Sequence, residues 1–130
     1  MLDTEQRRYT KTHEWIEIRE DAAYVGITDY AQEQITDVVF VELPKVDKQL
    51  AQGAEAAIVE SVKSAFSIYT PVAGKIVRVN DALDTEPGLV NTSPYEDGWL
   101  FALKPSDRAQ YEDLLDAVAY KALTEGPAHS

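Results

Sequence analysis

Glycine and proline residues break the middle of the chain into segments of the length that is typical of strands. These residues are Gly53, Pro71, Gly74, Pro87, Gly88, Pro94 and Gly98. Between them, and in the part of the chain before them, β-branched and aromatic residues are frequent. We expect strands over residues 15–18, 24–27, 38–43, 56–62, 66–70, 75–79 and 99–103. The pattern therefore predicts a mainly β fold.

Two segments depart from this pattern. Asp29 can cap a short helix that runs to Ile35, with Gln32 completing a start that resembles a capping box. In residues 106–125, apolar side chains recur at helical spacing before a Gly-Pro pair: Tyr111, Leu114, Leu115, Val118 and Ala122. This spacing predicts one C-terminal amphipathic helix that packs on the sheets. Its apolar stripe could instead dock a partner.

The length and charge of the chain restrict its organisation and its partners. With 130 residues, we expect one domain over residues 1–130. We also expect a monomer, although the sequence alone does not fix the oligomeric state. Twelve basic and 23 acidic residues give a net charge of −11, so nucleic acid and anionic membranes are poor partners. Residues 1–8 lack the apolar stretch of a signal peptide. We expect a bacterial cytoplasmic protein, although a mitochondrial matrix protein without its presequence would look the same.

The residues needed for conventional catalysis are scarce. The chain has no cysteine and two histidines, which excludes disulfides, cysteine–zinc sites, thiolate nucleophiles and His-rich metal clusters. His13 is the histidine in the body of the chain, and no nucleophile elbow accompanies it. Gly74-Lys75 resembles the end of a phosphate loop, but Tyr69 stands where that loop needs glycine. A stand-alone enzyme is therefore disfavoured.

Lys63 lies in the middle of a segment with two apolar-rich arms, residues 58–68. This arrangement favours a hairpin with Lys63 near its tip, although the tip lacks an Asn-Gly pair. By pattern alone Lys63 is an ordinary surface lysine. A Schiff-base lysine needs burial or a neighbouring cation, whereas Glu60 is an acid. A functional Lys63 is thus better explained as a target of modification by another enzyme than as a nucleophile.

The sequence around this lysine carries a family resemblance. It has the order Glu60-Ser61-Val62-Lys63-Ser64, followed by an Ile-Tyr-x-Pro-x-x-Gly turn over residues 68–74. Further matching blocks cover residues 9–15, 26–32, 39–44, 90–91 and 94–99. In these blocks, from about Tyr9 to Leu103, the chain resembles the H proteins of the glycine cleavage system. Biotin carriers are weaker fits, because they have methionines where Val62 and Ser64 stand.

The resemblance implies a carrier that is not itself an enzyme. Its lipoate would form an amide with Lys63, within a recognition context made by Glu60, Ser61, Val62 and Ser64. The implied fold is two antiparallel sheets in a flattened barrel-sandwich hybrid, similar to a lipoyl domain. The carrier would take the aminomethyl group of glycine from the pyridoxal-phosphate decarboxylase (P protein) to the tetrahydrofolate-dependent aminomethyltransferase (T protein), and its dithiol to dihydrolipoyl dehydrogenase (L protein). A lipoate ligase or octanoyltransferase would attach the cofactor.

The resemblance also implies a cleft that receives the amine carried on the arm. A cationic amine requires a carboxylate or hydroxyl in that cleft, and Glu14 and Thr12 are the candidates. Ser67 is a further candidate, at a position where the family commonly has aspartate. Glu14 could instead be a surface acid. Two alternative functions stay open: a lipoate relay protein of the same fold, and a non-catalytic acidic binding domain with Lys63 unmodified.

Overall fold

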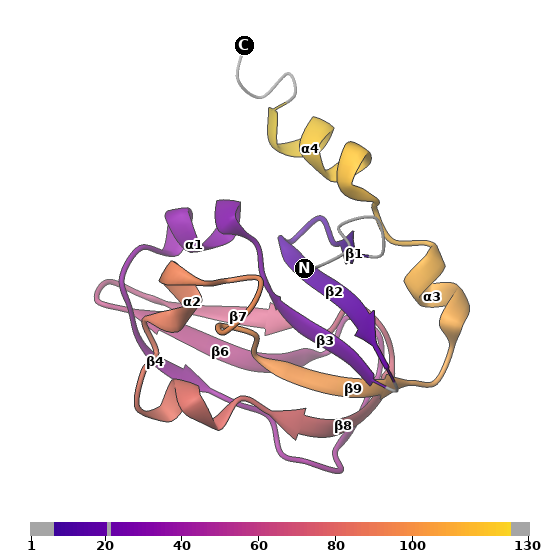
Figure 1. The fold of residues 1–130 in the computed structure, drawn as a ribbon, viewed down its shortest axis with the longest axis horizontal. Helices are drawn as coiled ribbons and strands as arrows, with labels where there is room; N and C mark the ends of the chain where they lie inside the picture. Colours follow the sequence, from indigo (N-terminus) through magenta and orange to yellow (C-terminus); the bar gives the residue numbers. More distant parts are fainter. Residues whose placement is uncertain (1–6, 21, 126–130) are drawn as a thin grey trace.

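Two antiparallel β-sheets stack on each other in the computed structural model, which describes residues 7–20 and 22–125 (Figure 1). The six-stranded sheet has the order β1 (Arg7–Tyr9), β2 (Glu14–Arg19), β3 (Ala22–Ile27), β9 (Phe101–Pro105), β8 (Gly74–Val79) and β5 (Gln49–Leu50). The three-stranded sheet has the order β4 (Val38–Glu42), β6 (Glu55–Ser61) and β7 (Ala65–Tyr69). The expected mainly β fold with two antiparallel sheets is confirmed. The short strands β1 and β5 were not expected.

The core lies between the two sheets, and the alternation of side chains along each strand supplies it. Ile16, Val25 and Phe101 are fully buried side chains of the six-stranded sheet. Val41 and Val59 face them from the three-stranded sheet, where they are cross-strand partners. The strand β6 alternates in this way, whereas the central strands β3 and β9 are buried on both faces along much of their length.

The helix α1 (Asp29–Ile35) covers the expected residues, but its cap differs from the expectation. Thr28 is the N-cap, and its hydroxyl accepts a hydrogen bond from the backbone N–H of Ala31 at 3.1 Å. Asp29 is the first helical residue and accepts from the side-chain amide of Gln32 at 2.9 Å. The expectation of an Asp29 cap is wrong by one position, because Thr28 supplies an equally suitable oxygen in extended backbone.

The expectation of one C-terminal helix over 106–125 is also wrong. The segment forms two helices, α3 (Arg108–Glu112) and α4 (Ala117–Glu125). Between them, Leu115 pairs with Tyr9 through two backbone hydrogen bonds: Tyr9 N–H donates to the Leu115 carbonyl at 2.8 Å, and Leu115 N–H donates to the Tyr9 carbonyl at 3.0 Å. A residue that pairs with a strand in this way leaves the helical ladder. The Gly-Pro pair expected to end the helix lies outside the described residues.

The helix α4 extends away from the sheets near β1 (Figure 1). Its side chain Val118, expected in the apolar stripe, is 80% exposed, and Ala122 is exposed as well. Tyr120 is the buried side chain among those described in α4. Of the expected stripe, Tyr111 is buried and Leu114 and Leu115 pack against the core clusters, whereas the contact made by α4 comes from Tyr120, which was not in that stripe.

The connection from β8 to β9 contains a short 3₁₀ helix, η1 (Asp81–Asp84), and the helix α2 (Leu89–Thr92). The strand expected at 99–103 begins two residues later, at Phe101. Within the part of the chain that the structure describes, no helix has the length and apolar character needed to cross a membrane.

Candidate functional site

Lys63 lies at the tip of the hairpin formed by β6 and β7, as expected. Strand β6 ends at Ser61 and β7 begins at Ala65, so Val62, Lys63 and Ser64 form the connection. The Lys63 side chain is exposed. The amine is therefore accessible to another protein, and the paired strands below it hold its backbone in place.

The hydroxyl of Ser61 organises this tip. Its oxygen accepts hydrogen bonds from the backbone N–H groups of Lys63 at 3.1 Å and Ser64 at 3.2 Å. The backbone N–H of Ser61 in turn donates to the carbonyl of Ser64 at 2.8 Å. Serine hydroxyls can replace a backbone acceptor in tight turns, which explains why this tip needs no Asn-Gly pair.

Four exposed apolar side chains lie in or near the hairpin tip, on both faces of the three-stranded sheet. They are Val39, Phe40, Val62 and Phe66, and we call them the tip patch. Phe40 is 50% exposed and lies directly across the sheet from Glu60, which is paired on its other side with Ala65. Exposed apolar side chains with an acidic neighbour are suited to contact with another protein, because the apolar groups supply contact area and the acid favours one orientation.

Glu14 is buried, with 1% of its surface exposed, and so it is not a surface acid. One carboxylate oxygen accepts from the hydroxyls of Thr10 and Thr12, both at 2.5 Å. The other accepts from the backbone N–H of Tyr69 at 3.1 Å. The described residues give Glu14 three neutral donors and no ion-pair partner, so its negative charge is available to a cationic ligand.

A cavity of about 360 Å³ lies beside Glu14. Thr12 and Glu14 line it from the turn before β2 and from the start of that strand, while Tyr69 lines it from the end of β7. Its remaining wall includes the apolar side chains of Tyr9, Leu114 and Leu115, and the oppositely charged Lys11 and Asp113 also line it. The cavity therefore combines an apolar wall with one buried carboxylate, as a pocket for an aliphatic amine requires.

Ser67 does not line that cavity. Its hydroxyl donates to the carboxylate of Glu55 at 2.6 Å, and both residues are exposed. Ser67 lies two residues before Tyr69 on β7, so both side chains are on the same face of the strand. A larger hollow of about 650 Å³ lies beside residues 42–48 and includes Glu55, but none of the site residues predicted from sequence lines it.

Tyr120 and Thr10 belong to the surroundings of Glu14 and were missed by the sequence analysis. The Tyr120 hydroxyl lies 2.8 Å from Nδ1 of His13, and burial raises the pKa of Tyr120 to about 12. Burial also lowers the pKa of His13, against a smaller opposing effect of Glu14. His13 has a φ of 74°, so the turn before Glu14 adopts a backbone conformation that is uncommon for histidine. No spacing rule in the sequence connects residue 120 with residue 13.

Residues 7–126 match the family model described as Glycine cleavage H-protein. The glycine cleavage system H protein of Thermus thermophilus is 53% identical over 94% of this chain and 95% of its own length. That of Thermotoga maritima is 52% identical over 88% of this chain and 93% of its own length. A crystal structure of a glycine cleavage system H protein from Mycobacterium marinum covers 92% of this chain and 97% of its own, with a TM-score of 0.84 and 36% identity.

Proposed function

The chain belongs to the glycine cleavage H-protein family and is a non-catalytic lipoyl carrier of that system, and from this premise we propose that Lys63 is its attachment site. The main support for this proposal is that Lys63 is exposed on a hairpin tip whose backbone is ordered by the Ser61 hydroxyl. The same tip presents Glu60, Val62 and Ser64 as the context that the attaching enzyme contacts. An attachment lysine must be accessible and fixed at its backbone, and this one meets both requirements.

Lipoate bound at Lys63 would supply a dithiolane on a flexible tether, which accepts the aminomethyl group and carries electrons. Tyr69, which lines the cavity, is six positions along the chain from Lys63, or roughly 20 Å along an extended strand at ~3.3 Å per residue. Ala65, Ser67 and Tyr69 alternate onto one face of β7, between the tip and the cavity. This face gives the arm a surface to lie along.

We further propose that the cavity beside Glu14 receives the amine. The Glu14 carboxylate is held by three neutral donors, so a bound ammonium group would be its charged partner. Thr12 orients the carboxylate through its hydroxyl. Ser67, beside Glu55, lies on the way to the cavity and adds a polar group to that face. Closing the amine into an apolar cavity would keep water from it.

The partners follow from membership of the system. We assign the P, T and L proteins as the enzymes that the arm visits, and a lipoate ligase or octanoyltransferase as the enzyme that modifies Lys63. The relatives named above are bacterial, which favours the bacterial cytoplasm over the mitochondrial matrix. The tip patch and Glu60 give each enzyme an apolar contact with an acidic edge.

The experiment that tests the attachment site is intact-mass measurement of the protein expressed with lipoate and its ligase, followed by peptide mapping. A lipoyl increment on the peptide that contains Lys63, absent from Lys63→Arg, is the expected result. Lys45→Arg is the matched control, because Lys45 is also exposed and is not at the tip. An increment that persists in Lys63→Arg, or no increment in a folded wild-type protein, would refute the site.

A further inference from the structure

The outer face of the six-stranded sheet carries a row of charged and aromatic side chains that the carrier function does not use. Cross-strand partners in one register share a face of the sheet. The row over β1, β2, β3 and β8 consists of Arg7, Glu17, Tyr24 and Arg78, with the small, buried Ala102 of β9 between the last two. Arg19 and Lys104 lie two positions from members of this row, on the same face. The alternate residues, such as Val25, point into the core.

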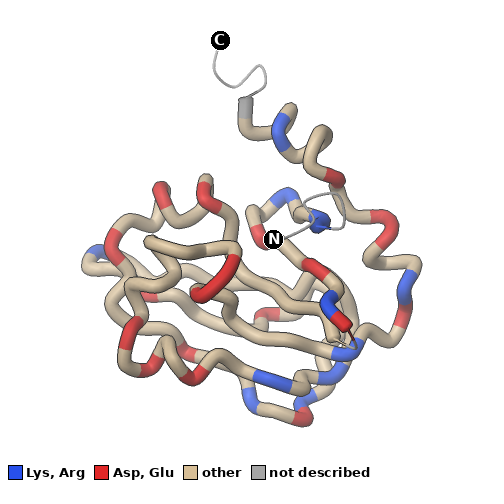
Figure 2. Tube along the Cα trace, viewed as in Figure 1, with Lys and Arg blue, Asp and Glu red and all other residues tan. Residues whose placement is uncertain are grey.

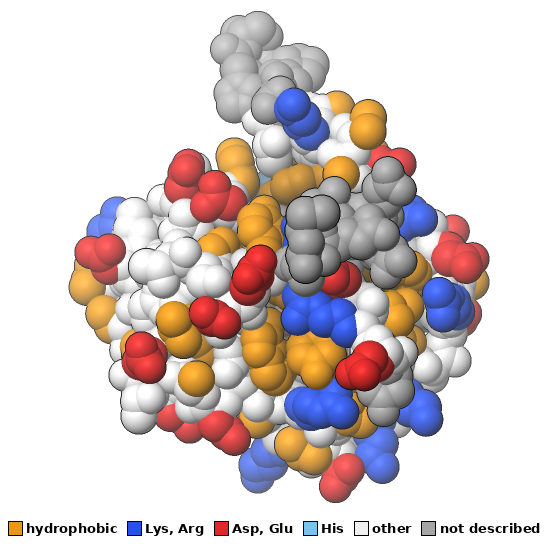
Figure 3. Space-filling model, in the orientation of Figure 1, with side chains coloured by type: hydrophobic (Ala, Val, Ile, Leu, Met, Phe, Trp, Pro, Cys, Tyr) orange, Lys and Arg blue, Asp and Glu red, His pale blue; other side chains and the backbone are white. Residues whose placement is uncertain are grey.

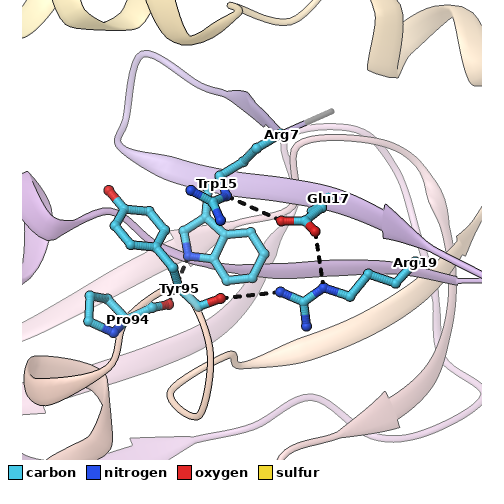
Figure 4. Close-up of polar contacts among 6 residues, drawn as sticks. All are labelled: Arg7, Trp15, Glu17, Arg19, Pro94 and Tyr95. Atoms are coloured by element: carbon cyan, nitrogen blue, oxygen red, sulfur yellow. Dashed lines mark hydrogen bonds and ion pairs between the residues drawn. The ribbon is translucent and has the colours of Figure 1, made fainter. Parts of the chain in front are cut away.

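The acid in this row is already neutralised. Glu17 is 4% exposed, and its carboxylate pairs with Nε of Arg7 at 3.3 Å and with Nε of Arg19 at 3.4 Å (Figure 4). The other end of the Arg19 guanidinium donates to the backbone carbonyl of Tyr95 at 3.2 Å. Counting the described residues alone, one carboxylate between two guanidinium groups leaves a net positive charge at this point, because arginine stays protonated.

Two half-buried aromatic rings hold the cations in position. Tyr24 and Trp99 pack edge to face, with their ring centroids 4.9 Å apart. The guanidinium carbons of Arg19 and Arg78 lie 5.0 and 5.9 Å from the Tyr24 centroid, and Arg78 donates to the Tyr24 hydroxyl at 3.1 Å. Cation–π contacts of this kind restrict flexible side chains before any partner arrives. We call Arg19, Tyr24, Arg78, Trp99 and Lys104 the cationic face; Arg7 is 5% exposed and is not part of it.

The cationic face contrasts with the rest of the molecule. The chain as a whole has a net charge of −11. Figure 2 shows acidic residues spread over the molecule; several basic residues lie close together in the lower part of the view, and others lie on α3, on α4 and near β1. The lower part of Figure 3 shows basic side chains on either side of exposed hydrophobic ones. Lys75 is the cross-strand partner of Lys104 and adds a further cation. Its Nζ lies 3.6 Å from a carboxylate oxygen of Asp47.

We propose that the cationic face is a second docking surface, which binds a carboxylate-bearing surface on one of the enzymes that the carrier visits. This inference rests on the proposed carrier function. Arginine and aromatic side chains are the groups most enriched where protein interfaces gain their affinity. The face belongs to the six-stranded sheet, whereas the Lys63 hairpin belongs to the other sheet. An enzyme bound here leaves the tip and its arm free to reach an active site.

An enzyme fits this surface better than the other possible occupants. Nucleic acid would meet a molecule with 23 acidic residues around a small basic patch, and its phosphates would be repelled. A second copy of this chain would place an acidic region on the cationic face, in a contact between two different surfaces. Such head-to-tail contacts form rings or open filaments unless the geometry closes them, which does not suit a carrier that exchanges partners.

The test measures binding without the cofactor, so that it does not depend on whether Lys63 is modified. In a Lys63→Arg background, Arg78→Glu with Lys104→Glu is compared with Lys45→Glu with Lys121→Glu, which changes the net charge equally at exposed positions outside the cationic face. Lys104→Glu alone is included as a variant that should fold normally, because that side chain is exposed on the surface of β9. Calorimetry with each of the P, T and L proteins, at low and high salt, gives the dissociation constants.

We expect the dissociation constant for one enzyme to rise roughly tenfold with Arg78→Glu/Lys104→Glu at low salt, and to change at most about twofold with the control pair. Lys104→Glu alone should give an intermediate increase. Equal effects of the two pairs, or no binding of any enzyme to the unchanged face, would overturn the proposal. So would sedimentation showing that the cationic face only mediates self-association, or binding of a DNA duplex that the variants abolish. In each of these cases a lipoyl increment on Lys63 would leave the carrier function standing.

Discussion

The hydroxyl of Tyr120 lies 2.8 Å from Nδ1 of His13, which joins the C-terminal helix to the turn that precedes Glu14. The same hydroxyl lies 2.7 Å from the hydroxyl of Thr28, the N-cap of α1. The Tyr120 ring stacks on Tyr9 with centroids 4.6 Å apart. One side chain of α4 thus connects β1, the turn at residues 10–13 and the start of α1. Its contacts give α4 a role in fixing the edge of the cavity.

Removing the Tyr120 hydroxyl should weaken this connection without removing the ring. In Tyr120→Phe the stacking on Tyr9 remains, whereas His13 and Thr28 each lose a hydrogen-bond partner. We expect the free energy of unfolding to fall by about 1–2 kcal/mol, the typical cost of leaving buried polar groups unpaired. Urea unfolding at neutral pH gives this value. Val118→Ala, at an 80% exposed position of the same helix, should change it by less than about 0.5 kcal/mol.

The lowered pKa of His13 predicts a dependence of stability on pH. Burial disfavours the charged imidazole in the folded protein, while the unfolded chain takes up its proton near the ordinary pKa of 6.5. As the pH falls below 6.5 the unfolded state binds more protons, so the folded state should lose stability down to the folded pKa. Urea unfolding at a series of pH values tests this, with His13→Gln as the control. A slope in this window that is identical in His13→Gln would show that other groups cause it.

Much of the fold follows from local sequence patterns. The strand segments and the Lys63 hairpin are visible because apolar residues alternate between glycines and prolines, and this alternation requires no knowledge of distant contacts. The prediction of a single C-terminal helix was wrong because that segment is shaped by a distant contact. Leu114 and Leu115 continue the helical spacing, but Leu115 pairs with Tyr9, more than a hundred residues away in sequence. Helical spacing alone cannot anticipate that pairing.

The candidate site likewise contains residues that local sequence identifies and residues that only distant contacts bring in. The chain resembles its family most clearly around Lys63, so the tip was named from the sequence. Glu14 and Thr12 were candidates, but the burial of Glu14 depends on the distant backbone N–H of Tyr69. Tyr120 reaches His13 from the far end of the chain, and no motif signals it. Ser67 lies on the expected strand, yet its hydroxyl bonds to Glu55, which only the pairing of β6 with β7 determines.

Neutralising Glu14 should weaken the hold of the cavity on an amine. Glu14→Gln keeps the shape of the side chain but loses the charge, and a charge-assisted hydrogen bond contributes about 1.5–3 kcal/mol. We expect the aminomethyl group on the lipoylated protein to be lost to water roughly tenfold faster, since about 1.4 kcal/mol corresponds to a factor of ten. Mass spectrometry over time measures this loss. Glu55→Gln is the control outside the cavity, and an equal acceleration there would contradict a specific role for Glu14.

Removing the Ser61 hydroxyl should impair modification of Lys63. Ser61→Ala deletes the acceptor for the backbone N–H groups of Lys63 and Ser64, so the tip loses its fixed conformation. We expect kcat/KM for lipoylation to fall by about tenfold, because binding of the attaching enzyme must then also order the tip, and this ordering costs free energy. Ser61→Thr, which keeps a hydroxyl, should restore most of the rate. Ser67→Ala removes an exposed hydroxyl farther along the hairpin and should have little effect; a comparable loss there would argue against ordering by Ser61.

Two glycines offer a matched test of the packing between β8 and β9. A Cβ on Gly74 would lie 2.4 Å from the backbone carbonyl oxygen of Lys104, whereas a Cβ on Gly88 would meet nothing within 4 Å. Gly88 has a φ of −64°, which alanine adopts freely. Gly74→Ala must therefore separate the paired strands and should cost about 3 kcal/mol of stability, while Gly88→Ala should be neutral or stabilising by up to about 1 kcal/mol. Urea unfolding of both variants measures the difference, and a Gly74→Ala protein as stable as Gly88→Ala would mean that β8 and β9 do not approach this closely.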